Sequence, residues 1–319
     1  MEHLVLIDGH HLMYRAYWAI PRTLKTKSGE QTNAVFGVAS MLLTILQREQ
    51  PDALLFCFDA GEETFRHVEH TEYKAGRAET PDDFYTQIPV IHELIDAFGL
   101  QHLADKRFEA DDLLGVYARL AEKQGARVTI VTGDRDAFQL ATDRIQIAIP
   151  HKGYQAAEYL GPAEILAKYG VRPDQICSYK GLVGDSSDNL PGVKGIGPKT
   201  AAELLQKYDT LTGVYAHLPE IKESVRTKLE HDHEQAFFCE RMATLVCDTE
   251  PGIPLDEVML KDLPANAVFD FFRAKEFTLL MKRFQSLVGS PFGQKIFQTS
   301  DIILPVEEKA EEQKQMALF

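Results

Sequence analysis

The chain has 319 residues, of which 45% are hydrophobic and 26% are charged, and its formal net charge at pH 7 is -14. This composition is ordinary for a soluble protein with one large or two modest domains. The negative charge argues against a protein that coats nucleic acid nonspecifically. It does not exclude an enzyme that acts on nucleic acid, because metal-binding carboxylates add to the negative count. The cysteines form no CxxC pair, and there is neither a signal peptide nor an apolar run of membrane length, so we expect a reducing cytoplasm.

Two short apolar runs near the start of the chain are each followed by an aspartate. Residues 4–7 resemble a buried strand before Asp8, and residues 53–58 resemble another before Asp59. Residues 34–49, between them, have helical apolar spacing. A strand, a helix and a strand in this order predict a parallel α/β sheet with acidic residues along one edge. His10 and His11 follow the first strand, and we do not assign this pair to the site.

The stretch from residue 109 to residue 136 carries acidic residues at the start of a helix and at the end of a strand. Carboxylates side by side raise one another's pKa, and a bound cation is the simplest remedy. Oxygen ligands favour Mg²⁺ or Mn²⁺ over zinc. The alternative is that acids at a helix start only complement the helix dipole. The acids before and within the helix are Glu109, Asp111 and Asp112, and those after the β-branched run 128–132 are Asp134 and Asp136.

Further elements complete an α/β domain over residues 1–172. Apolar spacing predicts a helix over 81–98 and another over 162–169, with a strand over 145–149. No long β-branched run follows, so we expect residues 173–290 to form an all-α second domain.

Residues 62–79 contain nearly equal numbers of acids and bases, but a helical wheel separates them. The cationic side is formed by Arg66, His70, Lys74 and Arg77, with Tyr73 at its border. Cations beside an aromatic ring suit phosphates and a stacked base. The alternative is a solvated amphipathic surface helix.

The second domain opens with a glycine-rich turn before a helix. Asp185 and Asp188 stand at helical spacing and offer two more metal ligands. The segment that follows, residues 190–207, places Gly195 and Gly197 in a tight turn, and Pro198 begins a helix whose amino end favours an anion. This segment resembles a helix-hairpin-helix, a motif that grips the DNA backbone without reading sequence. The residues that we expect to contact DNA here are Gly192, Lys194, Gly195, Gly197, Lys199 and Thr200.

The end of the chain combines a basic stretch with a polar tail. Residues 271–297 carry five cations and one acid, so they either extend a DNA-binding surface or are ordinary surface cations. Residues 291–319 are expected to be a flexible tail. The tail ends in a pattern that resembles the bacterial sliding-clamp binding peptide, formed by Gln315, Leu318 and Phe319.

Taken together, these motifs resemble the flap endonuclease and 5′-3′ exonuclease family, including the amino-terminal nuclease domains of bacterial DNA polymerases I. The resemblance spans roughly residues 1–288 and rests on the ordered acids, the hairpin at 192–201, and the motifs at 65–67, 73–77, 109–112 and 132–136. It implies an α/β nuclease domain with a helical arch at about 62–98, followed by the helical DNA-binding domain.

The resemblance also implies roles for these residues. One Mg²⁺ or Mn²⁺ ion would be served by Asp8, Asp59, Glu109, Asp111 and Asp112, and a second by Asp134, Asp136, Asp185 and Asp188. Lys74 and Arg77 would contact the scissile phosphate from the arch, and Tyr73 would stack on a nearby base. The hairpin would hold duplex DNA, with K⁺ as a further ligand.

We therefore expect a nuclease that removes RNA primers and 5′ flaps during replication and repair, in the cytoplasm at the nucleoid. The chain has no room for a polymerase domain after the nuclease region, which is consistent with a stand-alone nuclease or an excised fragment, and the clamp-like terminus favours the former. One alternative is a non-catalytic, structure-specific DNA-binding protein on the same fold. Another is a PIN-type endoribonuclease, which would not explain the hairpin or the cationic stripe.

Overall fold

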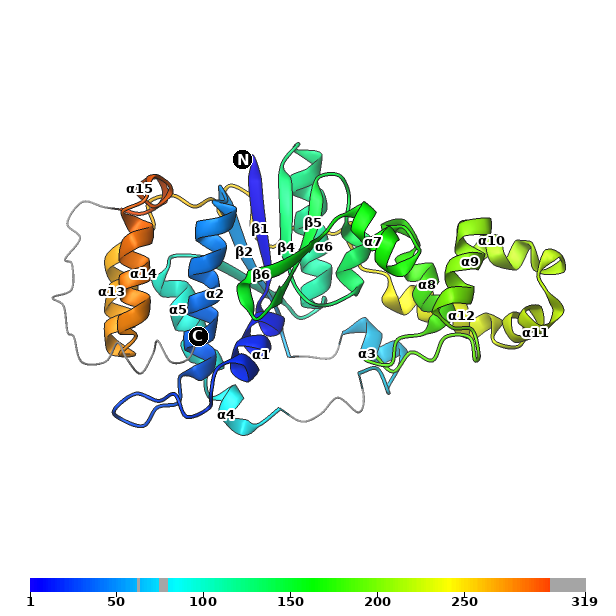
Figure 1. The fold of residues 1–319 in the computed structure, drawn as a ribbon, viewed down its shortest axis with the longest axis horizontal. Coiled ribbons are helices and arrows are strands. Elements are labelled where there is room, and N and C mark those ends of the chain that lie inside the picture. Colours follow the sequence, from blue (N-terminus) through cyan, green and yellow to red (C-terminus); the bar gives the residue numbers. More distant parts are fainter. Residues whose placement is uncertain (62–63, 75–79, 299–319) are drawn as a thin grey trace.

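The computed structural model describes residues 1–61, 64–74 and 80–298 of the chain. The molecule is elongated, with a sheet near its middle, the last helices at one end and a helical extension at the other (Figure 1). Among the described residues, no helix is long and apolar enough to span a membrane.

Six strands form one sheet in the order β3-β2-β1-β4-β5-β6. Neighbouring strands are parallel, except that β5 and β6 are antiparallel. The strands are β1 (His3–Asp8), β2 (Ala53–Asp59), β3 (Gln101–Asp105), β4 (Arg127–Val131), β5 (Ile145–His151) and β6 (Gly153–Leu160). The predicted mostly parallel α/β sheet is thereby confirmed.

The sequence patterns predict four of these strands and miss β3 and β6. Both lie at an edge of the sheet, where one side has no neighbouring strand. Most of their residues are partly or fully exposed, so neither carries the continuous apolar run of a buried parallel strand.

Helices cover both faces of the sheet. Successive residues of a strand point to opposite faces, so Val5 and Ile7 enter one core while Leu4 and Leu6 enter the other. The first core is covered by α1 (Gly9–Ala19), α2 (Asn33–Glu49) and α5 (Ile88–Ala97), and the second by α6 (Ala110–Lys123).

The predicted arch differs from the described structure in two respects. The cationic segment is not one continuous helix, because α3 spans only Phe65–Glu69 and turns follow it up to residue 74. The predicted helix over 81–98 is divided into α4 (Asp82–Tyr85) and α5, and α5 packs on α2 as part of the core. Residues 62–63 and 75–79, including Arg77, lie outside the described residues.

The helical extension follows the sheet. After α7 (Pro162–Tyr169), which ends at Gly170 as predicted, come α8 (Ile176–Val183), α9 (Pro198–Tyr208), α10 (Leu211–Ala216), α11 (Glu223–His231) and α12 (His233–Ala243). Short 3₁₀ turns cover Asp136–Leu140, Pro173–Gln175 and Leu218–Glu220.

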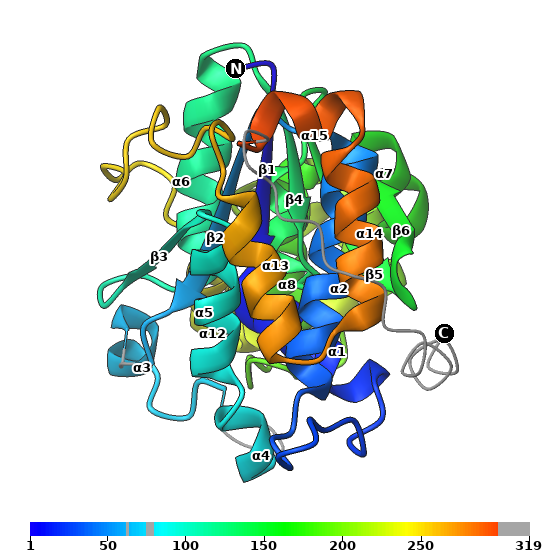
Figure 2. The ribbon, with the colours of Figure 1, turned by 90° about the vertical axis from the view of Figure 1, so that its left-hand side faces the viewer.

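The last helices correct the predicted division of the chain. They are α13 (Ala265–Ala274), α14 (Thr278–Val288) and α15 (Pro291–Ile296). These helices do not extend the helical domain, because α13 and α14 return to α5 and α2 on one face of the sheet (Figure 2). Phe269, Phe272 and Phe284 are buried there in the same core as Val5 and Ile7. Residues 291–298 are likewise part of the fold and not of a tail, since Ile296 and Phe297 are buried.

The basic stretch at 271–297 turns largely toward the α/β domain. Lys275 pairs with Glu30 at 2.7 Å, Lys295 pairs with Asp52 at 3.0 Å, and Arg283 donates to Ser40 Oγ at 2.7 Å. These three cations therefore fasten the last helices to the sheet layer, and they do not extend a DNA-binding surface.

Candidate metal centre and nucleic-acid cleft

The carboxyl ends of β1, β2 and β4 lie side by side and carry the predicted acids. Asp8 is the last residue of β1 and Asp59 the last residue of β2, while Asp134 follows β4 after a short turn. Asp111 stands in the first turn of α6 and joins them, because the charges of Asp134, Asp8 and Asp59 all act on it. We call Asp8, Asp59, Asp111 and Asp134 the acid cluster.

Local hydrogen bonds fix Asp8 at the centre of the acid cluster. Its Oδ1 accepts from the backbone N of His11 at 2.9 Å and so caps α1, and its Oδ2 accepts from Thr132 Oγ1 at 2.8 Å. Burial nevertheless raises the pKa of Asp8 to about 7, and the negative charges of Asp59 and Asp134 act in the same direction. The glycine between Thr132 and Asp134 is required by space, since a Cβ on Gly133 would lie 2.3 Å from the His11 ring.

Asp111 offers the clearest indication that the acid cluster suits a cation. Its Oδ1 is buried and has no hydrogen-bond partner, and burial together with Asp134 and Asp8 raises its pKa well above the ordinary value. As they stand, no three acidic, His or Cys side chains within the described ranges converge closely enough to form a complete metal site. The acid cluster still fits a divalent cation in its chemistry, because all its donors are carboxylates and their mutual repulsion has no cationic side chain at its centre.

Asp112 was predicted as a metal ligand, and the structure corrects this. Its two oxygens accept from Arg66 Nη1 and Nη2 at 2.7 and 2.8 Å, and from the backbone N of Glu109 and Val246 at 3.1 and 2.9 Å. A carboxylate has about four acceptor positions, so none remains for a metal. Spacing alone placed Asp112 beside Asp111, but the two side chains point to different surroundings.

The same contacts correct the prediction for Arg66, which was expected to lie on an exposed, DNA-binding stripe. Its side chain is 1% exposed and also donates to the backbone oxygens of Met242 and Thr244 at 3.0 and 2.9 Å. Arg66 thus ties α3 to α6 and to the end of α12. The ring of Tyr73 is also buried, beside Leu190 and Met242, so its face is not available for a stacked base in this structure.

Lys74, which was predicted to contact the scissile phosphate, lies beside Glu109 at the start of α6. Its Nζ lies 3.1 Å from Glu109 Oε2, and its charge acts on Asp111, where it opposes the rise in pKa. The residue has a positive φ of 57°. Glu109 begins α6 and also accepts from Tyr73 Oη at 3.3 Å.

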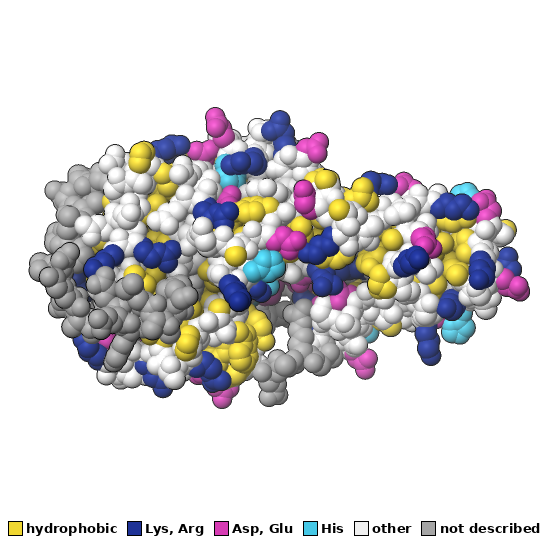
Figure 3. Space-filling model, viewed as in Figure 1, with side chains coloured by type: hydrophobic (Ala, Val, Ile, Leu, Met, Phe, Trp, Pro, Cys, Tyr) yellow, Lys and Arg dark blue, Asp and Glu magenta, His cyan; other side chains and the backbone are white. Residues whose placement is uncertain are grey.

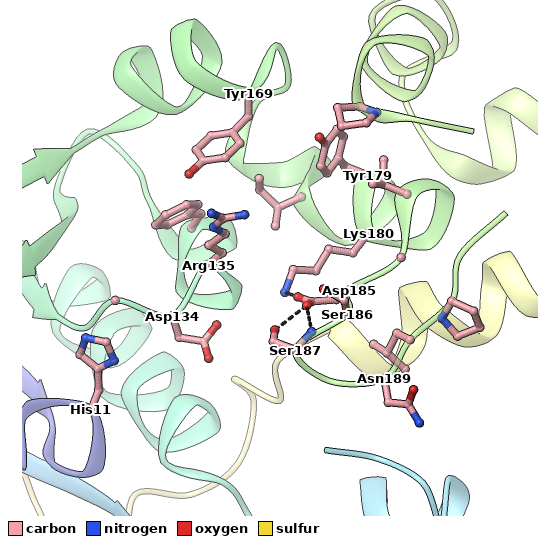
Figure 4. A pocket seen from close by; sticks show the side chains of 18 residues that line it. His11, Asp134, Arg135, Tyr169, Tyr179, Lys180, Asp185, Ser186, Ser187 and Asn189 are labelled. Carbon is pink, nitrogen blue, oxygen red and sulfur yellow. Dashed lines mark hydrogen bonds and ion pairs between the residues drawn. The ribbon is translucent and has the colours of Figure 1, made fainter. Parts of the chain in front are cut away.

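Three of the acids predicted to bind the second cation, Asp136, Asp185 and Asp188, have contacts that differ from those of the acid cluster. Asp185 and Asp188 do not share a helix, because residues 185–190 form a turn closed by an antiparallel bridge between Asp185 and Leu190. Lys180 of α8 forms ion pairs with Asp136 and Asp185, and Figure 4 shows the pair with Asp185. Asp188 is buried, and its Oδ2 lies 3.5 Å from Tyr73 Oη.

A cleft of about 1090 Å³ connects the acid cluster to the hairpin. Asp134 and His11 lie on one side of it, with Lys180, Asp185 and Ser187 across from them (Figure 4). Several of its polar or aromatic lining residues were not predicted as site residues, among them His11, Arg135, Tyr179 and Lys180. The sequence places Lys180 five residues before Asp185, so a contact between these two side chains could have been predicted. No pattern in the sequence indicates that Lys180 also pairs with Asp136.

The segment before residue 75 is docked against the turn that carries Asp188. The backbone N of Lys74 donates to the Asp188 carbonyl at 3.3 Å, and Asn189 Nδ2 donates to the Glu72 carbonyl at 3.0 Å. His70 is half-buried, with its Nε2 3.3 Å from the Asn189 carbonyl. The start of the predicted arch therefore lies against the 185–190 turn, directly before the hairpin.

The predicted hairpin is present between α8 and α9. Gly192 has a φ of 63°, and a Cβ there would lie 2.2 Å from the Gly184 backbone N, so only glycine fits. Gly197 is the N-cap of α9, and open space surrounds the position that its Cβ would take. The side chains of Lys194 and Lys199 are exposed, and Thr200 is half-buried. Lys228 Nζ lies 2.9 Å from the Gly195 carbonyl, so a K⁺ ion at that carbonyl would have to share it with an ammonium group.

The face shown in Figure 3 carries Lys and Arg side chains along the helical extension and around the hollow near its centre. The whole chain is acidic, so this distribution matters more than the net charge.

Comparison with known proteins assigns both parts of the chain. Residues 3–170 match the N-terminal, resolvase-like domain of 5′-3′ exonucleases, and residues 171–266 match the C-terminal SAM fold of the same family. DNA polymerase I of Bacillus subtilis is 40% identical over 281 residues, covering 88% of this chain and 32% of the relative. The thermostable DNA polymerase I of Thermus thermophilus is 41% identical over 286 residues, covering 90% and 33%. The chain thus spans about a third of the length of these relatives.

Solved structures share the fold at lower identity. The bacteriophage T5 D15 flap endonuclease, in a complex with DNA and metal ions, has a TM-score of 0.64 at 17% identity, covering 92% of this chain and all of that chain. The catalytic core of Rad2 with a DNA substrate has a TM-score of 0.55 at 15% identity, covering 86% and 88%. Because the first family match alone extends over more than half of the chain, the protein belongs to the 5′-3′ exonuclease family.

Proposed function

We propose that the protein is a structure-specific 5′-3′ exonuclease and 5′-flap endonuclease that hydrolyses phosphodiester bonds of DNA and of RNA primers with two divalent cations, Mg²⁺ or Mn²⁺. The observation that carries the proposal is the acid cluster, where Asp111 Oδ1 is buried without a partner and Asp8 has a raised pKa. The known family and the DNA complexes of the T5 and Rad2 structures support the choice of substrate.

The acid cluster and Glu109 would hold the first cation, which in such sites makes bound water more acidic and stabilises charge on phosphoryl oxygens. The chain's own residues then position the substrate. Thr132 holds Asp8, and the cap on α1 fixes its other oxygen, so the carboxylates keep their arrangement while a nucleic acid enters. Lys74, beside Glu109, is placed to contact a phosphate that reaches the acid cluster. Arg77 has the same proposed role but lies outside the described residues.

Cleavage of a 5′-labelled flap duplex tests this function. Products should appear at the junction with Mg²⁺ and should be absent with EDTA. Asp134→Ala should abolish cleavage and leave duplex binding within about threefold, because Asp134 follows β4 and is not one of the hairpin residues proposed to hold the duplex. Tight duplex binding without cleavage in either Mg²⁺ or Mn²⁺ would instead favour the non-catalytic DNA-binding alternative.

The hairpin is proposed to hold the duplex through backbone amides at the start of α9 and through Lys194 and Lys199. Gly197 offers the close approach to a phosphate that this requires, since no heavy atom lies within 4 Å of its Cβ position. The same surface would serve any branched DNA with a duplex arm.

We further propose that Gln315, Leu318 and Phe319, which lie outside the described residues, bind the bacterial sliding clamp and bring the enzyme to replicating DNA at the nucleoid, in the cytoplasm. Deletion of residues 315–319 should remove clamp binding in a pull-down with purified clamp and leave cleavage of a free flap unchanged. Retained clamp binding would reduce these residues to an incidental terminus.

A further inference from the structure

Lys180 lies between two of the carboxylates that were expected to hold a second cation. Its Nζ is 2.6 Å from Asp185 Oδ2 and also forms an ion pair with Asp136 Oδ1. The three side chains are largely enclosed, with 8% of Lys180, 9% of Asp136 and 16% of Asp185 exposed. A positive charge from the chain itself therefore already occupies the space between these two acids.

The ion pairs of Lys180 settle the local charge without a metal. The ammonium group of Lys180 lies against the Asp185 carboxylate, and the backbone N and Oγ of Ser187 donate hydrogen bonds to the same carboxylate. A divalent cation at the same two carboxylates would meet the Lys180 ammonium at close range, and two enclosed positive charges repel strongly. In this structure, Asp136 and Asp185 do not fit a second cation while Lys180 stays in place.

The acid cluster shows the opposite condition. Asp111 Oδ1 is buried without a partner, and the carboxylates of the cluster repel one another. Lys74 acts on Asp111 from its place beside Glu109, whereas Lys180 pairs directly with both Asp136 and Asp185.

We propose that Lys180 is a built-in counter-ion that occupies the position of the second cation, so that the substrate-free protein binds one divalent cation tightly, at the acid cluster, and a second only after Lys180 leaves Asp136 and Asp185. This inference rests on the proposed function, because it concerns the order in which the same centre is assembled. Lys180 is a positioning residue in this scheme: it holds the two carboxylates in place before the second cation arrives.

Mn²⁺ binding to the full chain without DNA tests the proposal, with free Mn²⁺ measured by electron paramagnetic resonance. The wild-type protein should bind one ion tightly and a second at least about tenfold more weakly. Lys180→Met keeps the length of the side chain and removes its charge, so it should tighten the second event by about tenfold or more and leave the first unchanged. Lys180→Arg keeps the charge and should behave like the wild type.

Two further variants separate the possible failures. Asp136→Asn combined with Asp185→Asn should abolish the second event and leave the first intact, and it provides a readout if Lys180→Met does not fold, as judged by circular dichroism. Two equally tight ions in the wild type, or an unchanged second event in folded Lys180→Met, would overturn the role of Lys180. Absence of any tight ion in the wild type would instead contradict the proposed function, and Asp111→Asn identifies the first event because it should remove that event alone.

Discussion

At the scale of single residues, the pair of Arg66 and Asp112 shows how a correct motif can be assigned to the wrong chemistry. Both residues belong to motifs that resemble the nuclease family. Their side chains, however, form hydrogen bonds with each other and with backbone groups, and not with a metal ion or DNA. A sequence gives the spacing of Asp111 and Asp112 but not which of them meets a cation from another element. The acid cluster itself followed from the sequence, because the acids stand at strand ends that a parallel sheet must bring together.

We expect Arg66→Met to lower the free energy of unfolding by about 3–5 kcal/mol, because it leaves the Asp112 carboxylate buried without its partner. Urea unfolding followed by circular dichroism measures this. The matched control is Arg241→Met, which removes the exposed pair with Glu69 and should cost less than about 1 kcal/mol. Equal costs would show that the buried pair has no special weight.

Lys74 leads to a kinetic prediction. Lys74→Ala should lower the single-turnover rate of flap cleavage by about a hundredfold or more and weaken DNA binding by much less, because its Nζ lies beside Glu109, next to the proposed metal ligands. Gel-shift binding in Ca²⁺ and rapid quench in Mg²⁺ supply the two numbers. Equal losses of rate and binding would contradict a role at the scissile phosphate.

His3 gives the protein a pH dependence that is separate from the acid cluster. Burial and the nearby Arg127 lower its pKa below 6.5, so the folded state disfavours the protonated imidazole and the unfolded state does not. The contribution of His3 to stability is therefore complete above about pH 6.5 and is lost as the pH falls below it. Between about pH 7.5 and 5.5 the wild type should lose free energy of unfolding relative to His3→Gln; the comparison is needed because Asp8, whose pKa is raised, acts in the opposite direction in both proteins. An identical slope in the variant would exclude His3 as a source.

At the scale of elements, the hairpin and the arch show which local signals are reliable. The hairpin was predicted because glycine and proline at fixed positions determine a turn and the start of a helix, and both are present. The cationic stripe failed because a helical wheel assumes a continuous helix, whereas α3 ends at Glu69. Arg66 and Tyr73 are buried by residues of α12 and of the 185–190 turn, which are distant in the sequence, so no local pattern could predict their burial.

Two glycines of the hairpin should separate stability from DNA binding. Gly192→Ala should lower the free energy of unfolding by about 2 kcal/mol or more, because its Cβ meets the Gly184 backbone and its φ is positive. Gly197→Ala has open space and should change stability by less than about 1 kcal/mol, yet weaken duplex binding, since the methyl group lies where a phosphate would approach. Unfolding curves and fluorescence anisotropy with a labelled duplex measure the two effects. Full duplex affinity in Gly197→Ala would remove this turn from the proposed interface.

At the scale of the whole molecule, the α/β domain is built from both ends of the described chain. The sequence predicted the sheet and the helical region but placed the last helices in the wrong domain. The periodic aromatic residues of these helices predict that one face of each helix is buried. The pattern does not predict which part of the protein covers that face. Only the burial of Phe269, Phe272 and Phe284 in one core with α2 and α5 shows that the chain returns.

Two truncations test this closure. Removal of residues 265–319 should expose the core face that α13 and α14 cover and yield a protein that binds a hydrophobic dye and loses its cooperative thermal transition. Removal of residues 299–319 alone should leave the transition within about 2 °C of the wild type, because α13–α15 and the buried Ile296 and Phe297 all remain in the shorter chain. A cooperative transition in the shorter chain would show that the last helices are not required for the sheet to fold.

The return of α13 and α14 to α5 and α2 also bears on the order in which the protein can fold during synthesis. Both cores use residues from late in the described chain, since the core under α6 includes Leu255 and Val258 and the opposite core includes residues of α13 and α14. The sheet and the helices α1, α2 and α5 are synthesised before these segments. During synthesis the acid edge can therefore take shape while α2 and α5 still expose an apolar face, so the nascent chain should depend on chaperones until α13 and α14 have been made.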